Sequence, residues 1–279
     1  MPAPSEPLPS QVLRALPLPR AVSLGRPLAW LALGWRDLRK LGLVSYVHGL
    51  VMALFAVFLL LLGANQFWFL AGAFSGFLVV APILATSLYA LSRCLQEGYA
   101  PDFLVISRTW TNWHQGRFNR WGQGHWALAR FGFLLGIAGT GWVLTSAAMV
   151  KLLVATPVQT PLEFLRFVVL AADSYVFEAW LALGALLAAP IFASTVVSVP
   201  LLLDRRLNVL DAVLASWSVV LVNPLQMALW AALIMVLTLL GFATGLLGLV
   251  VVVPLLGHAS WHAYCDLLDT TQLARRESD

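Results

Sequence analysis

The stretch GHASWHAY, residues 257–264, holds the side chains of this sequence that are best suited to chemistry. His258 and His262 are four positions apart, so in a helix they share one face and can point at one partner. Two such imidazoles can bind a transition metal or a haem, pass protons, or form hydrogen bonds between packed helices. His48 is expected at a similar depth in the molecule and is a candidate third member of the site.

The residues around the histidine pair favour hydrogen bonding over metal binding. The only acid near it in the sequence is Asp266, which leaves a hard metal ion without ligands. A zinc metalloprotease needs Glu after the first His, where this chain has Ala259. One helix also cannot place histidines four apart on opposite sides of a haem. We expect neutral imidazoles bonded to neighbouring helices, worth about 1 kcal/mol each, and no resident cofactor, with haem, metal or transport roles as the alternatives.

The composition is that of a membrane protein. Hydrophobic residues make up 60% of the 279 positions and charged residues 11%, less than half the share of about 25% found in soluble domains. Long, nearly uncharged stretches recur, as in transmembrane helices. Cys94 and Cys265 are too few for a disulfide framework or a thiolate metal site. No nucleotide-binding loop, nucleophile elbow or carboxylate pair is present, so we expect no catalytic residues and no enzyme.

Six apolar segments are long enough to cross a bilayer, which predicts an all-α membrane protein. The expected organisation is a disordered N-terminal tail (1–25), a transmembrane domain (26–268) and a C-terminal tail (269–279). The expected spans are 44–63, 68–92, 127–150, 177–203, 222–243 and 245–265.

The distribution of basic residues predicts the orientation of these spans. Only Lys151 and Arg166 fall on one side of the membrane, and positively charged loops are typical of the cytoplasmic side. Both tails are therefore expected in the cytoplasm. The fifteen basic residues on that side are Arg14, Arg20, Arg26, Arg36, Arg39, Lys40, Arg93, Arg108, Arg117, Arg120, Arg130, Arg205, Arg206, Arg275 and Arg276.

Local motifs predict several helix starts and contacts. Thr160, Pro161 and Glu163 form a capping box that should open a short helix in the outer interface. Asn223 before Pro224 should cap the fifth span. The segment 108–126 interleaves arginine and tryptophan. On a membrane surface this pattern favours anionic lipid headgroups as partners, not nucleic acid.

An internal repeat relates the even-numbered spans, which align on Pro82, Pro190 and Pro254. Each proline should kink its helix. Three cytoplasmic, tryptophan-bearing segments (31–42, 104–113 and 212–224) precede the odd-numbered spans. The repeat units are approximately 28–93, 102–205 and 207–266, each a short interfacial helix followed by a hairpin of two spans.

The repeat also predicts a layer of polar side chains inside the bundle. Packing of three units about a pseudo-threefold axis would bring together the residues four and eight positions after the prolines. These candidate site residues are Thr86, Ser194 and His258, followed by Ser198 and His262.

Residues 196–268 contain the segments VVSVPLLLDRRLNVLDAVLASW, NPLQMALWAALIMVLTLLG and LGLVVVVPLLGHASWHAYCDLL, and the N-terminal part contains WLALGWRDL and VVAPILATSLYALSR. These segments resemble a bacterial family of predicted integral membrane proteins, domain of unknown function 2189. The similarity is strongest over 196–268. The resemblance implies a six-span inner-membrane protein and supplies no reaction.

The sequence thus favours a non-catalytic membrane protein that acts as an accessory, assembly or scaffold component of a larger complex. Its expected partners are membrane lipids and other membrane subunits. A small permease or channel that uses the polar layer is one alternative. A haem- or metal-handling subunit of a respiratory complex, built on His258, His262 and His48, is another.

Overall fold

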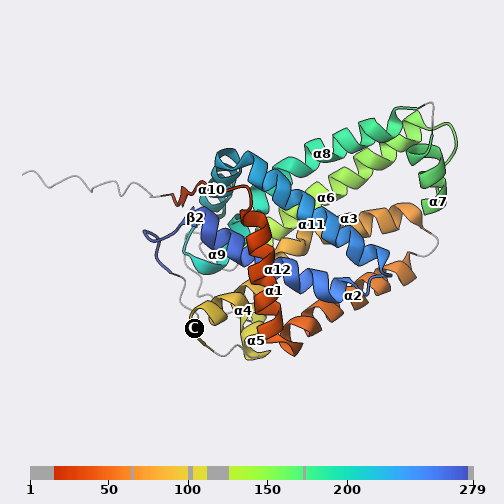
Figure 1. Cartoon of the computed structure of the whole chain (residues 1–279). Helices are drawn as coiled ribbons and strands as arrows, with labels where there is room; N and C mark the ends of the chain where they lie inside the picture. Colours follow the sequence, from red (N-terminus) through yellow and green to blue (C-terminus); the bar gives the residue numbers. More distant parts are fainter. Residues whose placement is uncertain (1–15, 64–65, 100–102, 112–125, 172–173, 276–279) are drawn as a thin grey trace, which may run out of the picture.

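The computed structural model describes residues 16–63, 66–99, 103–111, 126–171 and 174–275, which are almost entirely helical (Figure 1). The helices are α1 (Arg26–Leu41), α2 (Leu43–Leu62), α3 (Phe67–Leu84), α4 (Thr86–Gln96), α5 (Phe103–Thr111), α6 (Trp126–Leu153), α7 (Pro161–Phe164) with the π-helical turn η1 (Leu165–Val169), α8 (Val176–Thr195), α9 (Ser198–Asp204), α10 (Val209–Val222), α11 (Pro224–Ala243) and α12 (Leu249–Leu267). Two short strands are β1 (Leu18–Pro19) and β2 (Leu268–Asp269).

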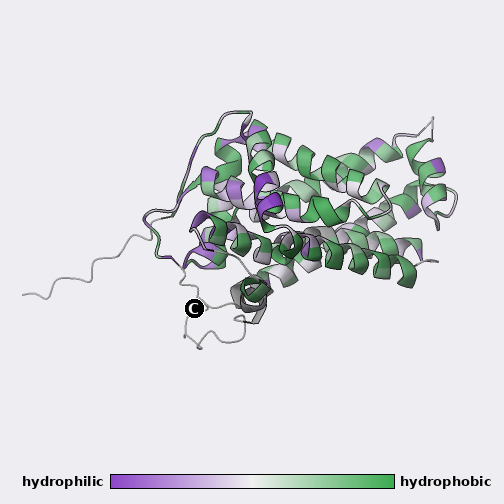
Figure 2. Ribbon diagram, turned by 60° about the horizontal axis from the view of Figure 1, so that its bottom comes forward, coloured by the Kyte–Doolittle hydropathy of each residue, from purple (hydrophilic) through white to green (hydrophobic). Residues whose placement is uncertain are grey.

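The long helices form one elongated bundle, and α1 crosses it near one end (Figure 1). That end also carries β1 and β2, and we call it the terminal end; α7 lies at the opposite end. Hydrophobic residues cover the lengths of the helices, whereas hydrophilic residues gather towards the terminal end (Figure 2). This separation is the one expected of a bundle whose sides face lipid.

Among the described residues, four helices are long and apolar enough to cross a membrane: Leu43–Leu62, Arg130–Leu153, Val176–Asp204 and Pro224–Ala243. All six expected spans are helical, but two fall outside this group. The segment Phe67–Phe77 of α3 qualifies only as a shorter apolar stretch. Helix α12 carries His258, His262 and Asp266, whose polarity lowers its mean hydropathy.

Helix α12 lies at the centre and packs against α1, α2, α4 and α11. Glycines allow the helices to approach closely at these crossings. A Cβ atom on Gly34 of α1 would lie 2.7 Å from the backbone nitrogen of Ala259, and one on Gly49 of α2 would meet the backbone of Val250. Both substitutions would force α12 away from its neighbours, so its position depends on glycine at each crossing.

The three prolines of the predicted repeat behave differently. Pro82 lies three residues before the interruption at Ala85 that separates α3 from α4. Pro190 lies within α8, which ends before α9 begins at Ser198. Helix α12 instead continues through Pro254 without a break. The three copies are therefore not equivalent in helix continuity, because α12 is held by packing on several sides.

The two predicted helix starts have different outcomes. The capping box at Thr160 is confirmed: Glu163 N donates to Thr160 Oγ1 (3.2 Å), and Thr160 N donates to Glu163 Oε2 (3.1 Å). Asn223 does precede α11, but its side chain makes no capping bond. It accepts from Val22 N (2.9 Å) and donates to the carbonyl oxygen of Arg20 (2.9 Å). The cap prediction was wrong because the side-chain amide of Asn223 bonds instead to the backbone of the N-terminal segment.

The two terminal segments are paired with each other at the terminal end. Strands β1 and β2 are antiparallel, with Leu18 opposite Asp269, and Arg20 N donates to Leu267 O (2.8 Å). Residues 16–25 therefore make defined contacts, contrary to the expectation of a disordered N-terminal tail over 1–25, and residues 269–275 of the C-terminal tail are described as well. The remaining tail residues, 1–15 and 276–279, lie outside the described residues.

Candidate functional site

Helix α12 directs both of its histidines into the interior, towards three neighbouring helices. His258 has no exposed surface and His262 is 6% exposed. Nε2 of His258 lies 2.9 Å from Ser45 Oγ on α2, and its Nδ1 lies 2.8 Å from Ser92 Oγ on α4. The ring of His258 therefore links α12 to two helices that are separate in the sequence.

His262 contacts a carboxylate that the sequence interpretation did not assign to the site. Its Nε2 lies 2.7 Å from Oδ2 of Asp37, a residue of α1 that is only 2% exposed. Ser92 donates to the same oxygen at 3.0 Å. Asp37, Ser45, Ser92, His258 and His262 form one connected group, which we call the histidine network.

Asp37 is buried because it lies on the face of α1 that packs against α12. The buried residues of α1 include Trp30, Gly34, Leu38 and Leu41, which recur at helical spacing with Asp37 among them. Of its charged neighbours in the sequence, Arg39 is exposed, whereas Arg36 Nε lies 3.7 Å from Asp37 Oδ1 with its side chain 55% exposed. The signal for this site residue was thus present in the sequence as an acid on the apolar face of an amphipathic helix.

The hydrogen bonds of the network have a definite direction. A carboxylate can only accept, and Ser92 has a single hydroxyl proton, which it gives to Asp37. Ser92 must then accept from Nδ1–H of His258, which leaves Nε2 of that ring to accept from Ser45. Asp37 is therefore the final acceptor of two series of hydrogen bonds. One series runs from Ser45 through His258 and Ser92, and the other is the single contact with His262.

The surroundings of Asp37 favour its ionised form. Burial alone would raise the pKa of this carboxyl, but the hydrogen bond and electrostatic interaction with His262, together with the hydrogen bond from Ser92, outweigh it and lower the pKa. A buried carboxylate is costly unless it is fully hydrogen-bonded. Each partner of Asp37 is therefore important for the docking of α1.

His48 lies outside this group and makes a separate contact. Its Nε2 lies 2.9 Å from Ser87 Oγ, so it links α2 to α4 as Ser45 and His258 link α2 to α12. His48 is 8% exposed and Ser87 is fully buried. No hydrogen bond described in the structure joins His48 to the other two histidines, although all three were candidates for one site.

The predicted polar layer also separates into local contacts. Thr86 donates to Ile83 O (2.8 Å) and Ser198 to Ser194 O (2.5 Å), both on nearby turns of the same chain segment. Ser194 Oγ accepts from Trp217 Nε1 (3.0 Å) on α10. These bonds satisfy carbonyls and hydroxyls near the interrupted helices, whereas His258 bonds to α2 and α4.

The chemistry open to the network is limited by its burial. Ser45 and His258 have the spacing of a nucleophile and its base, but both are completely buried. Within the described ranges, no three His, Cys, Asp or Glu side chains are placed to hold a metal ion. Asp266, the acid expected nearest the pair, accepts instead from Arg26 Nε (2.6 Å) and Trp30 Nε1 (2.9 Å). The arrangement is suited to joining helices and to passing a proton.

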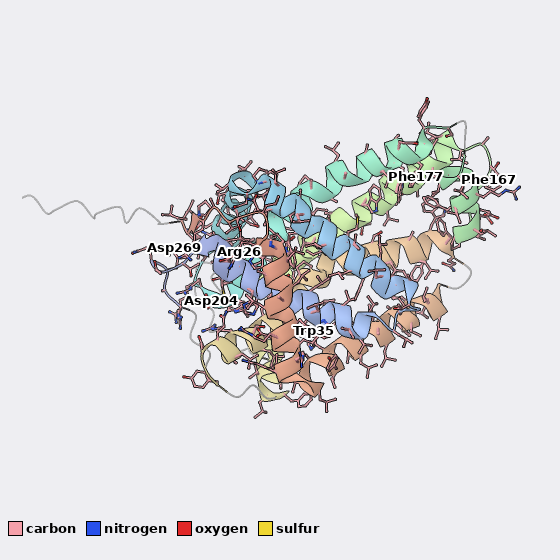
Figure 3. The ribbon with its side chains drawn as sticks, in the orientation of Figure 1. Arg26, Trp35, Phe167, Phe177, Asp204 and Asp269 are labelled. Atoms are coloured by element: carbon pink, nitrogen blue, oxygen red, sulfur yellow. The ribbon has the colours of Figure 1, made fainter. Side chains whose placement is uncertain are left out.

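Beyond the network, Gln96 connects the site to the terminal end. Its Nε2 lies 3.5 Å from Nδ1 of His262, and its Oε1 accepts from Trp261 Nε1 (2.8 Å). Gln96 also lines a pocket of about 240 Å³, which we call the terminal pocket. Asp204, in the same pocket, accepts from Tyr264 OH (2.8 Å) and Arg205 Nε (2.8 Å). Figure 3 labels Asp204 at this end of the molecule, on the same side as Asp269.

The expected family resemblance is confirmed by a comparison with family models. Residues 68–204 match the model described as "Predicted integral membrane protein (DUF2189)". Neither a curated protein nor a solved structure matches the chain.

The matched region differs from the one in which the resemblance was expected to be strongest. Of residues 196–268, only 196–204 fall within the match, which instead contains the basic and aromatic segment 108–126. The description supports an integral membrane protein. The histidine pair and Asp37 lie outside the matched residues, whereas Ser92 and Gln96 lie inside them.

Proposed function

We propose that this chain is a non-catalytic, multi-pass protein of the bacterial inner membrane that serves as an accessory, assembly or scaffold component of a larger membrane complex. In this proposal α2, α3 with α4, α6, α8 with α9, α11 and α12 are the six spans, and the terminal end faces the cytoplasm. The three helices α1, α5 and α10 would then lie at the cytoplasmic interface as parts of a threefold repeat.

The closed histidine network is the observation that carries this proposal. Its strongest polar groups, Asp37, His258 and His262, are buried and bonded to one another or to serines on adjacent helices. Among the described residues, no buried side-chain nitrogen or oxygen lacks a hydrogen-bond partner. Groups satisfied in this way hold helices together and leave little capacity for binding a substrate in the interior.

Purification in a mild detergent tests this role directly. The proposal expects the full-length protein to co-purify with other membrane proteins in fixed stoichiometry, with no Soret band and no stoichiometric metal. A preparation of this chain alone, in which ions or protons cross liposome membranes, would overturn it in favour of a permease or channel. A Soret band or bound metal that disappears in His258→Gln would instead support the haem- or metal-handling alternative.

A proton-conducting role is the second candidate, and the geometry of the network favours it. Hydrogen bonds connect Ser45, His258, Ser92, Asp37 and His262. Alternating donors and acceptors of this kind can relay protons inside a membrane. Liposomes carrying the protein and a pH-sensitive dye would test this role. It predicts a proton flux in the wild type that is lost in Asp37→Asn, and equal leak in both proteins would contradict it.

A further inference from the structure

The terminal pocket collects arginines from four separate segments of the chain. Arg20 follows β1, Arg93 lies in the last turn of α4, Arg205 follows α9, and Arg275 lies in the C-terminal segment. With two carboxylates, Glu97 and Asp204, among the lining residues, four positive charges face two negative ones and leave an excess of two. Asp269, which bonds Arg20 at 2.9 Å from outside the lining, reduces that excess to one.

We propose that the terminal pocket binds a phosphate-bearing anion. Arginine presents five N–H donors in a planar fork and binds phosphate through paired hydrogen bonds. An anion that enters the pocket would meet guanidinium groups from several directions. The inference deepens the proposed function, because it identifies a ligand for the end of the bundle that the proposal places at the cytoplasmic surface.

The arginines divide into an inner and an outer pair. The side chains of Arg93 and Arg205 are 15% and 11% exposed, and both contact Asp204, at 3.6 and 2.8 Å. The side chains of Arg20 and Arg275 are 49% and 63% exposed. The inner pair is oriented by Asp204 before any ligand arrives. The outer pair is also paired, Arg20 with Asp269 at 2.9 Å and Arg275 with Glu97 at 3.3 Å, so an anion at the mouth of the pocket would compete with these two carboxylates for exposed guanidinium groups.

The size of the pocket suits a phosphate or phosphodiester group. Its volume of about 240 Å³ corresponds to about eight water molecules at ~30 Å³ each. That space accommodates a phosphate group with part of its substituent. Thr270 adds a hydroxyl group to the lining, and a hydroxyl can donate one hydrogen bond to a phosphate oxygen; the hydroxyl proton of Thr271 is already donated to Asp269 (2.7 Å).

The positive-inside distribution alone does not account for this arrangement. It requires basic residues on one side of the membrane, with no requirement that they converge on one cavity. Arg39 and Lys40 on α1 satisfy the same distribution, yet they are exposed and are absent from the pocket lining. They therefore provide a control for general attraction between a basic surface and anions.

The experiment compares two double variants of the full-length protein that lose the same charge. Arg20→Gln with Arg275→Gln alters the mouth of the pocket, and Arg39→Gln with Lys40→Gln alters α1. Binding of inorganic phosphate is measured by calorimetry in detergent at two salt concentrations. Retention of phosphatidylglycerol is measured by native mass spectrometry, with phosphatidylcholine as the uncharged comparison. Arg275→Gln alone is the substitute if the first double variant does not fold.

We expect the mouth variant to weaken binding of at least one probe by about tenfold or more, as when a charge-assisted contact is lost, and the α1 variant to remain within about twofold of the wild type. Phosphate binding in detergent would identify a soluble phosphate compound, and phosphatidylglycerol retention alone would identify a lipid headgroup. Equal losses in the two variants, or no binding of either probe, would overturn the inference. Neither result would affect the co-purification test of the proposed function.

Discussion

Nε2 of His262 and Oδ2 of Asp37 are 2.7 Å apart, although 225 positions separate the two residues in the sequence. This contact joins the first described helix to the last one. It is also continuous with Ser92 on α4, which bonds to both Asp37 and His258. Helices α1 and α12 are therefore joined by a buried polar contact, in addition to the bonds that Asp266 of α12 accepts from Arg26 and Trp30 of α1.

Removal of the Asp37 carboxylate should strongly destabilise the protein. We expect Asp37→Ala to lower the free energy of unfolding by about 3–5 kcal/mol, the usual effect of removing one partner of a buried charged contact. Arg39→Ala, an exposed change on the same helix, should have an effect below about 0.5 kcal/mol. Unfolding by sodium dodecyl sulfate in mixed micelles measures both. Equal stability of the two variants would show that Asp37 is not needed to dock α1.

Replacement of His258 should separate a structural role from a ligand role. His258→Ala should reduce stability by about 1–2 kcal/mol, because it removes two interhelical bonds and leaves a small cavity. His258→Gln should recover much of this loss, since an amide can still bond Ser45 or Ser92. The same unfolding assay, combined with absorption spectra, measures the difference. A Gln variant less stable than the Ala variant would count against the hydrogen-bonding role.

The close crossing of α1 and α12 predicts a large effect of a single methyl group. A Cβ atom on Gly34 would approach the backbone nitrogen of Ala259 to 2.7 Å, so Gly34→Ala should cost about 1–3 kcal/mol through forced separation of the helices. Gly136 on α6 has open space around its Cβ position, and Gly136→Ala should be neutral or slightly stabilising. Thermal aggregation in detergent compares them. Similar melting temperatures would show that the crossing can relax.

The pairing of the terminal segments should weaken in acid. Hydrogen bonds from Thr271 and Arg20, together with the charge of Arg20, hold the pKa of Asp269 well below its usual range. A lowered folded-state pKa gives stability that is present above the unfolded value of about 3.9 and is lost as the pH falls through the folded value. The protection of the amides of residues 16–20 and 267–271, measured as exchange relative to the intrinsic rate at each pH, should therefore decrease in acid. In Asp269→Asn it should already be low at neutral pH, and unchanged protection would contradict this assignment.

The proposed topology predicts opposite signals from two reporter positions. Ala155 follows α6, near the α7 end, and Gln272 follows β2, at the terminal end. A phosphatase fusion should be active at Ala155 and inactive at Gln272, because that enzyme matures only outside the cytoplasm, and a fluorescent-protein fusion should show the reverse. Activity of the phosphatase at Gln272 would reverse the orientation derived from the basic residues.

Local patterns in the sequence predicted the helices well, because the formation of each helix depends mainly on residues close to one another in the sequence. The capping box at Thr160 and the helical segments match the structure, since caps and apolar stretches act over one or two turns. Asn223 shows where such patterns become insufficient. Its position before Pro224 favours a cap, but the partners of its side chain, Val22 N and Arg20 O, come from the other end of the chain.

The candidate site was predicted in part for the same reason. The spacing of His258 and His262 indicated a shared inward face, and both rings do lie inside the bundle. Asp37 was missed because an acid in a basic segment was assigned to the membrane surface, although it shares the buried face of Trp30 and Gly34. Ser92 and Ser45 had no local signal, since only the packing of α2 and α4 on α12 brings their hydroxyls to the histidine.

The central position of α12 has a consequence for the order in which the protein is made. During synthesis, α1 and α2 leave the ribosome long before the helix on which they pack, and at ~5–20 residues per second the interval is on the order of tens of seconds. Throughout that time Asp37 and Ser45 have no histidine partner. A chain truncated before Leu249 would leave Asp37 and Ser45 without either histidine, whereas the core cluster around Val150, Val158 and Val168, which contains no residue of α12, could still form.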